Sequence, residues 1–168
     1  MVVDGKPRPS RYDNTPPVNA QCTLVVLEGA PELRGEQAWI GGIVTGDTGK
    51  MGRRVIDLVH ADPELALVGA ITHTTHAALG WDAGEVAGIG PLGIVLEHDC
   101  TRALSQAQVI IDFSVAEAAL VSIRLAAVHT KPIVVGTTGF TPSQYEEIHH
   151  LSQHMPCFVA PIMSVGVS

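Results

Sequence analysis

Apolar runs and helical segments alternate along this chain from residue 39 onward, and this alternation constrains the fold more than any other feature. The runs are apolar throughout, so we expect them to be strands that are buried on both faces. They are 40–45, 65–71, 109–114, 132–136 and 157–161. Such strands, separated by helices, predict a parallel sheet covered on both sides. Right-handed crossovers then give an α/β fold, a Rossmann-like doubly wound parallel sheet.

Three segments between these strands show helical periodicity. They are 51–62, 115–130 and 141–154. In the first helix, Val55, Leu58 and Val59 share one face, which we expect to pack against the sheet. Asp62 and Pro63 end that helix, because proline cannot continue it.

The other two helices have clear inner faces or end signals. Alanine, leucine and isoleucine form the inner face of 115–130. In 141–154, Thr141 is the expected N-cap, Pro142 occupies the first helical position and acidic residues follow in the first turns.

Composition narrows the classes of function. Hydrophobic residues make up 46% of the 168 residues, charged residues make up 16%, and the net charge is −7. This is a globular composition, and its negative charge disfavours nucleic acid or an anionic membrane as the main partner. No segment reaches the ~20 apolar residues that span a bilayer, and the first residues lack a signal-peptide layout. We therefore expect a soluble cytoplasmic protein.

Three glycines separate the first strand from the first helix in the stretch GDTGKMGRR. Gly46 permits a tight turn, Gly49 lets the backbone approach a pyrophosphate, and Gly52 lets the helix pack near the strand. Lys50 and Arg53 add positive charge nearby. A glycine turn without a ligand is the alternative, but the strand before it and the helix after it favour a nucleotide.

The position that contacts the ribose carries no acid. A carboxylate about 20 residues beyond the glycines usually holds the 2′-hydroxyl of NAD, whereas this chain has Thr72 and His73 there. His73 together with Lys50 could meet a 2′-phosphate, so NADPH is at least as plausible as NADH. Asp47 places a carboxylate in the turn itself, which would repel phosphate unless it points away.

Residues 1–38 differ from the rest because they are rich in proline and show no sustained period. The apolar stretch 22–30 could form a short strand, but its neighbours offer it no obvious partner. We interpret 1–38 as an extension, partly disordered, and 39–161 as a dinucleotide-binding domain.

Five segments together resemble a known family. They are GDTGKMGRR, GWDAGEVAGIGPLGI (80–94), VIIDFS, KPIVVGTTGFT (131–141) and FVAPIMSVGVS (158–168). Their order and spacing resemble the N-terminal domain of the 4-hydroxy-tetrahydrodipicolinate (dihydrodipicolinate) reductase family over residues 40–168. That resemblance implies NAD(P)H-dependent reduction of 4-hydroxy-tetrahydrodipicolinate to tetrahydrodipicolinate, in the diaminopimelate route of lysine biosynthesis.

The resemblance also implies which residues contact the nucleotide, NADPH or NADH. They are Gly46, Asp47, Thr48, Gly49, Lys50, Met51, Thr72, His73, Gly136, Thr137, Thr138, Ala160, Pro161, Ile162 and Met163. For Thr137 and Thr138, the alternative is a hydroxyl-rich turn that caps nearby backbone.

Some positions depart from the family pattern. Ile162 stands where the family commonly has asparagine, and Thr72 replaces the usual acid. Gly41 and Gly42 lie in the first strand, where larger residues are usual, and we expect them to weaken it.

The family's second domain follows the SVGV segment, and this chain stops where that domain would begin. By resemblance, the absent domain carries the proton-donating His/Lys motif, the site for a pyridine-type dicarboxylate substrate and most contacts of a homotetramer. Residues 162–168 would start the hinge to it. We therefore expect no catalytic residue in this chain, which would carry only the cofactor-binding half and be inactive alone. The alternative is a non-catalytic nucleotide-binding remnant or module, and a different Rossmann dehydrogenase is disfavoured.

Other polar clusters suggest no chemistry. His73 and His76 lack a third metal ligand, and His149 with His150 is not the family motif, because no lysine follows at the right spacing. Asp82 and Glu85 could pass for an acid/base pair, but a solvated or capping role in a loop requires less.

Overall fold

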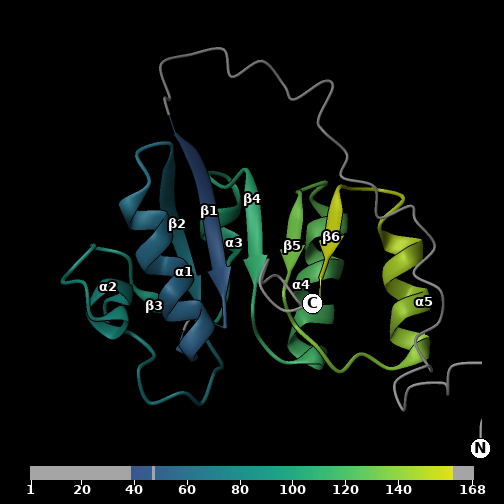
Figure 1. The fold of residues 1–168 in the computed structure, drawn as a ribbon, viewed down its shortest axis with the longest axis horizontal. Helices are drawn as coiled ribbons and strands as arrows, with labels where there is room; N and C mark the ends of the chain where they lie inside the picture. Colours follow the sequence, from purple (N-terminus) through teal and green to yellow (C-terminus); the bar gives the residue numbers. More distant parts are fainter. Residues whose placement is uncertain (1–38, 47, 161–168) are drawn as a thin grey trace, which may run out of the picture.

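The computed structural model describes residues 39–46 and 48–160, which form one six-stranded parallel sheet with helices on both faces (Figure 1). The strand order is β3-β2-β1-β4-β5-β6. The strands are β1 (Ile40–Thr45), β2 (Leu65–Ile71), β3 (Leu96–Glu97), β4 (Val109–Asp112), β5 (Ile133–Val135) and β6 (Cys157–Val159). The helices are α1 (Lys50–Ala61), α2 (Ala83–Ala87), α3 (Thr101–Leu104), α4 (Ala116–Val128) and α5 (Pro142–Leu151). This arrangement confirms the doubly wound sheet.

The expected strands and long helices are all present, and the differences concern their ends. β4 stops at Asp112, two residues before the expected end of that run. The stretch between β2 and β4 contains α2, β3 and α3, which the sequence did not predict because elements of two to five residues are too short to show a period. The possible strand 22–30 and the hinge 162–168 lie outside the described residues.

The buried face of α1 differs from the prediction. Gly52, Ile56 and Val59 are buried, whereas Leu58 is 52% exposed and Val55 is only partly buried. The buried residues follow the i, i+4, i+7 spacing of one helical stripe. Leu58 lies beside that stripe, so its assignment to the inner face was wrong.

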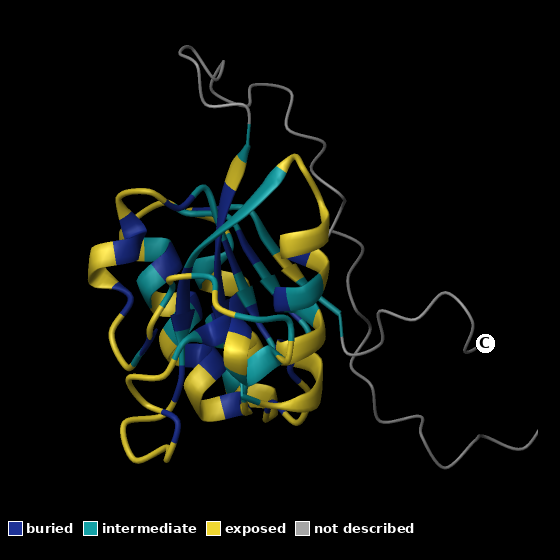
Figure 2. Ribbon diagram, turned by 90° about the vertical axis from the view of Figure 1, so that its left-hand side faces the viewer, coloured by how far each residue is buried: buried dark blue, intermediate teal, exposed yellow. Residues whose placement is uncertain are grey.

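Adjacent residues of β1 divide the core between the two faces of the sheet. Ile43 belongs to a cluster with residues of α3, α4 and α5, whereas Val44 belongs to a cluster with residues of α1 and α2. Successive side chains of a strand point to opposite faces, so both faces of β1 are covered. Figure 2 shows buried residues in the centre and exposed residues on the outer sides of the helices.

Gly41 is explained by close packing at the start of β1. A Cβ atom there would lie 2.5 Å from the carbonyl oxygen of Gln106. The Gly41 N–H also donates a 2.6 Å hydrogen bond to Oε1 of Gln108. The register with β2 shifts between Gly42 and Ile43. The weakening of β1 by its glycines stays a prediction.

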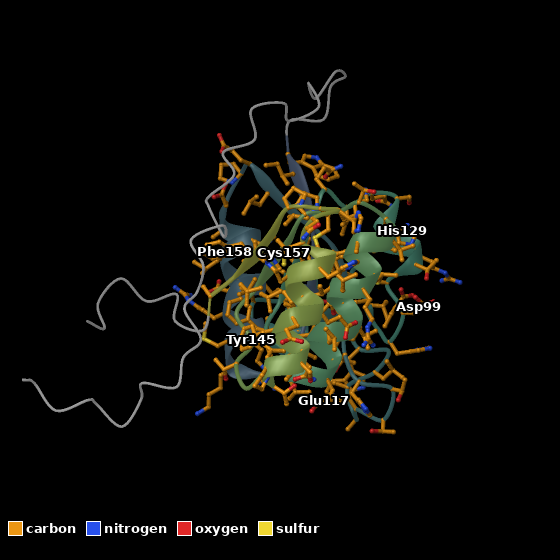
Figure 3. The ribbon with its side chains drawn as sticks, turned by 90° about the vertical axis from the view of Figure 1, so that its right-hand side faces the viewer. Asp99, Glu117, His129, Tyr145, Cys157 and Phe158 are labelled. Carbon is orange, nitrogen blue, oxygen red and sulfur yellow. The ribbon has the colours of Figure 1, made fainter. Side chains whose placement is uncertain are left out.

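Helix α5 begins with the expected cap. The Thr141 hydroxyl accepts from the Gln144 N–H, and the Gln144 side chain accepts from the Thr141 N–H, with Pro142 at the start. The acidic residues Glu146 and Glu147 lie in the second turn, and none lies in the first. Glu147 instead accepts two hydrogen bonds from Arg124 of α4, at 2.6 and 3.0 Å. The hydrogen bond from Arg124 lowers the pKa of Glu147. Figure 3 shows α4 and α5 side by side.

Candidate nucleotide-binding site

The turn after β1 is wedged between the ends of two neighbouring strands. Gly46 has φ +74°, a conformation that favours glycine. A Cβ atom on it would lie 2.5 Å from the Phe113 carbonyl oxygen and 2.7 Å from the Ser114 nitrogen. The Gly46 N–H donates to the carbonyl oxygen of Ile71, at the end of β2, over 3.1 Å. Gly46 is therefore required by the protein itself.

Gly49 differs from Gly46 because the protein does not require a glycine there. It is the N-cap of α1, with an ordinary φ of −72°, and a Cβ atom on it would meet only the Gly46 carbonyl oxygen, at 3.3 Å. Within the described residues, the space beside it is otherwise open. The glycine thus leaves the helix N-terminus accessible to a ligand that approaches the backbone closely.

The N-terminus of α1 also lacks compensating groups. No side-chain hydrogen bond caps it among the described residues, and its first turn holds no acid but begins with Lys50. By contrast, Asp82 caps α2 and Thr141 caps α5. Free N–H groups and the helix dipole make such an end suited to an anion. Arg53 donates from Nε to the Thr48 carbonyl oxygen at 3.0 Å, which places a second cation at the turn.

Thr72, one of the two residues predicted to contact the ribose, lies beside Thr48 at the end of β2. Their hydroxyl oxygens lie 3.5 Å apart, and Thr72 is buried. The Thr72 N–H donates to the Glu97 carbonyl oxygen at 2.8 Å, which fixes this strand end. His73 is exposed, and its Nδ1 lies 2.9 Å from the Thr75 hydroxyl.

The turn after β5 presents residues of different exposure. Gly136 lies against Phe113, because a Cβ atom on it would be 2.1 Å from the ring. Thr137 is buried and donates from its hydroxyl to Asp112 at 2.8 Å, whereas Thr138 is exposed. The Thr137 hydroxyl is therefore bonded within the protein, and Thr138 is the residue of the pair whose side chain is exposed.

Asp112, Phe113 and Ser114 are residues of this edge that the sequence interpretation missed. Asp112 ends β4, and its carboxylate accepts hydrogen bonds from Thr45, Ser114 and Thr137. The signal in the sequence was an acid at the end of an otherwise apolar strand. It could have marked the carboxyl edge, but two of its partners, Thr45 and Thr137, are distant along the chain.

The described candidate residues lie at or beside the carboxyl ends of β1, β2, β5 and β6, on one edge of the sheet (Figure 1). They are Gly46, Thr48, Gly49, Lys50, Met51, Thr72, His73, Gly136, Thr137, Thr138 and Ala160. Asp47, Pro161, Ile162 and Met163 lie outside the described residues. Ligands of open α/β sheets bind at this edge.

The polar cluster at Asp82 has a structural role. The Asp82 carboxylate accepts from the N–H groups of Gly84, Glu85, Leu92 and Gly93, at 2.7–3.2 Å, which is the capping role expected of it. These bonds, that of Leu92 foremost, lower the pKa of Asp82.

The histidines gather at no metal site in the part of the chain that the structure describes, where no group of three His, Cys, Asp or Glu side chains could hold a metal ion. His149 and His150 lie near the end of α5, which leads away from the carboxyl edge toward the start of β6 (Figure 1).

Comparison with known proteins identifies the family. The family model described as "Dihydrodipicolinate reductase, N-terminus" matches residues 40–163. The chain belongs to the dihydrodipicolinate reductase family. A 4-hydroxy-tetrahydrodipicolinate reductase of Syntrophus aciditrophicus is 42% identical over 126 residues, 75% of this chain and 47% of the relative. One of Syntrophotalea carbinolica is 40% identical over 125 residues, 74% of this chain and 47% of the relative. The chain thus spans about half the length of the curated relatives it matches.

A solved structure shares the fold of this family domain. It is a dipicolinate-bound dihydrodipicolinate reductase from Paenisporosarcina sp. TG-14, with a TM-score of 0.61 and 22% identity. The match covers 76% of this chain and 49% of that one.

None of the helices within residues 39–46 and 48–160 has the length and apolar character to cross a membrane.

Proposed function

We propose that this chain is the cofactor-binding half of an NAD(P)H-dependent 4-hydroxy-tetrahydrodipicolinate reductase, which forms tetrahydrodipicolinate for lysine biosynthesis. The observation that carries the proposal is the open N-terminus of α1 behind Gly49, in a chain of this family. The nicotinamide cofactor would supply a hydride. The protein would supply the binding site and the orientation of the ring.

The described residues fit a dinucleotide. The pyrophosphate would lie on the free N–H groups beside Gly49, with Lys50 and Arg53 adding positive charge. Thr48 and Thr72, joined at the end of β2, would contact the ribose next to the adenine. The turn at Thr138 would receive the nicotinamide half, across the sheet from Thr72.

NADPH should bind no more weakly than NADH. Among the candidate contacts with the adenosine ribose, Thr72 and His73 present no carboxylate to repel a 2′-phosphate. Lys50 begins α1 and follows shortly after Thr48, whose hydroxyl oxygen lies 3.5 Å from that of Thr72. The proposal extends to the properties expected of the whole enzyme: a pyridine-type dicarboxylate substrate, assembly as a homotetramer, location in the cytoplasm, and no nucleic-acid or membrane partner.

Calorimetric titration of the chain with NADPH and NADH tests this function. Saturable binding of both, with NADPH at least as tight, supports it. Absence of binding at millimolar concentrations would contradict it. Oxidation of NADPH by the chain with 4-hydroxy-tetrahydrodipicolinate then tests turnover, which we expect to be negligible unless the substrate-binding half of the family enzyme is supplied.

A further inference from the structure

Asp112 is a fully buried carboxylate at the end of β4, with 0% of its surface exposed. Its Oδ1 accepts from the Ser114 N–H at 3.0 Å, the Ser114 hydroxyl at 2.8 Å and the Thr137 hydroxyl at 2.8 Å. Its Oδ2 accepts from the Thr45 hydroxyl at 2.5 Å. In every one of these bonds an oxygen of Asp112 is the acceptor.

These bonds join three strand ends at the point where the strand order reverses. Thr45 ends β1, Ser114 follows β4, and Thr137 belongs to the turn after β5. In the order β3-β2-β1-β4-β5-β6, the chain first moves outward from β1 to β3 and then returns to β4 on the other side of β1. The strand order therefore reverses between β1 and β4. A dinucleotide bound at this crevice places one nucleotide over each half of the sheet.

Asp112 lies in the half of the sheet where the nicotinamide end of the dinucleotide would bind. The phosphate cradle at Gly49 and the threonine pair at the end of β2 lie on the β1–β3 half. The nicotinamide half would therefore extend over β4 and β5, where Asp112 lies beneath the turn of Thr137. Since Asp112 is buried, water and salt screen its charge less than that of a surface carboxylate.

We propose that Asp112 is a positioning residue whose fixed negative charge favours the oxidised nicotinamide over the reduced ring. This inference rests on the proposed function. The oxidised ring is cationic and the reduced ring is neutral, so a nearby buried carboxylate stabilises the oxidised form selectively. The same carboxylate holds the turn after β5 in place through the Thr137 hydroxyl.

Substitution Asp112→Asn removes the charge and retains the shape. The three donors at Oδ1 keep their acceptor, and the new amide can donate to the Thr45 hydroxyl, which can accept as well as donate. Thr45→Val is the matched control, because it removes the bond at Oδ2 but keeps the charge. Dissociation constants for NADP⁺ and NADPH are measured by calorimetry for all three chains.

The expected result is a change in the ratio of the two affinities. In Asp112→Asn, NADP⁺ should lose roughly threefold or more in affinity relative to NADPH. In Thr45→Val, both affinities should change by the same factor. Equal losses for both nucleotides in Asp112→Asn overturn the charge role, because a purely structural residue acts on both alike.

A measurement on the unaltered chain covers the case in which Asp112→Asn does not fold. The unaltered chain should bind NADP⁺ at least as tightly as NADPH, because both share the same phosphates and differ in the charge of the ring. Clearly tighter binding of NADPH overturns the inference while leaving the proposed function intact. Failure of the unaltered chain to bind either nucleotide overturns the proposed function itself.

Discussion

The hydroxyl oxygens of Thr48 and Thr72 lie 3.5 Å apart, so the turn after β1 and the end of β2 form a single surface. This pair places a neutral group where dinucleotide-binding folds that prefer NAD usually carry an acid. The pair therefore bears on which nucleotide the chain selects.

Replacing Thr72 with aspartate should shift the preference toward NADH. A carboxylate at this position would repel a 2′-phosphate and could accept from a 2′-hydroxyl. We expect the affinity for NADPH to fall about tenfold relative to NADH, a change of about 1.4 kcal/mol. Thr72→Asn is the matched neutral control and should leave the ratio unchanged. Titration of both variants with both nucleotides checks this, and an equal shift in the asparagine variant would mean that charge is not the cause.

Replacing Gly49 with aspartate should abolish nucleotide binding without unfolding the chain. The φ of −72° suits any residue, and among the residues that the structure describes a Cβ atom meets only the Gly46 carbonyl oxygen, at 3.3 Å. Aspartate is also a favourable N-cap, so the helix should be as stable as before or slightly more so. Its charge would occupy the place where phosphate approaches, and we expect a loss of about 100-fold or more in affinity.

Gly49→Asn is the control for this substitution, since it adds the same bulk without the charge. Its affinity should fall less than that of the aspartate variant. Thermal unfolding of both variants should match the unaltered chain. If Gly49→Asp binds NADPH with unchanged affinity, the phosphate cradle is in the wrong place.

Replacing Gly136 with alanine should destabilise the domain. The new methyl group would lie 2.1 Å from the Phe113 ring, so the ring or the strand end must move. Overpacking of this kind typically costs about 1–3 kcal/mol. Urea unfolding measures the loss. In a Phe113→Ala background the same change should cost much less, and an equal cost in both backgrounds would show that the ring is not the obstacle.

The Asp82 cap should make stability depend on pH in the acid range. Four N–H groups, that of Leu92 foremost, hold the pKa of Asp82 below its ordinary value of 3.8. Because the pKa is lower in the folded chain than in the unfolded chain, the stabilisation is fully present above pH 3.8 and is lost as the pH falls through the folded value.

Asp82→Asn tests this cap. At neutral pH the variant should be less stable by about 1 kcal/mol, because the amide oxygen of asparagine can keep the capping bonds at Oδ1, whereas its amide nitrogen cannot accept from the Gly93 N–H. As the pH falls below 3.8, the difference in stability between the variant and the unaltered chain should shrink, and it should shrink further on acidification. Urea unfolding at several pH values measures it. A difference that stays constant across this range would show that the charge of Asp82 contributes nothing.

The sequence was sufficient where the determining forces are local. The run 65–71 became β2 with the expected bounds, and Thr141 with Pro142 began α5 as expected. Apolar runs and capping residues act on their immediate neighbours, so their pattern identifies the element directly. The short elements between β2 and β4 could not be predicted in this way, because their stability comes from packing and from the long reach of the Asp82 carboxylate to Leu92.

The sequence by itself determined the strand–turn–helix order, the glycine turn and hence the carboxyl edge at which the candidate residues gather. Only the tertiary structure decided which face of α1 is buried and why Gly136 must be small. It also revealed the bond between Thr45 and Asp112, which are 67 residues apart. Crossover connections bring such distant residues together, and no local period records which partners will meet.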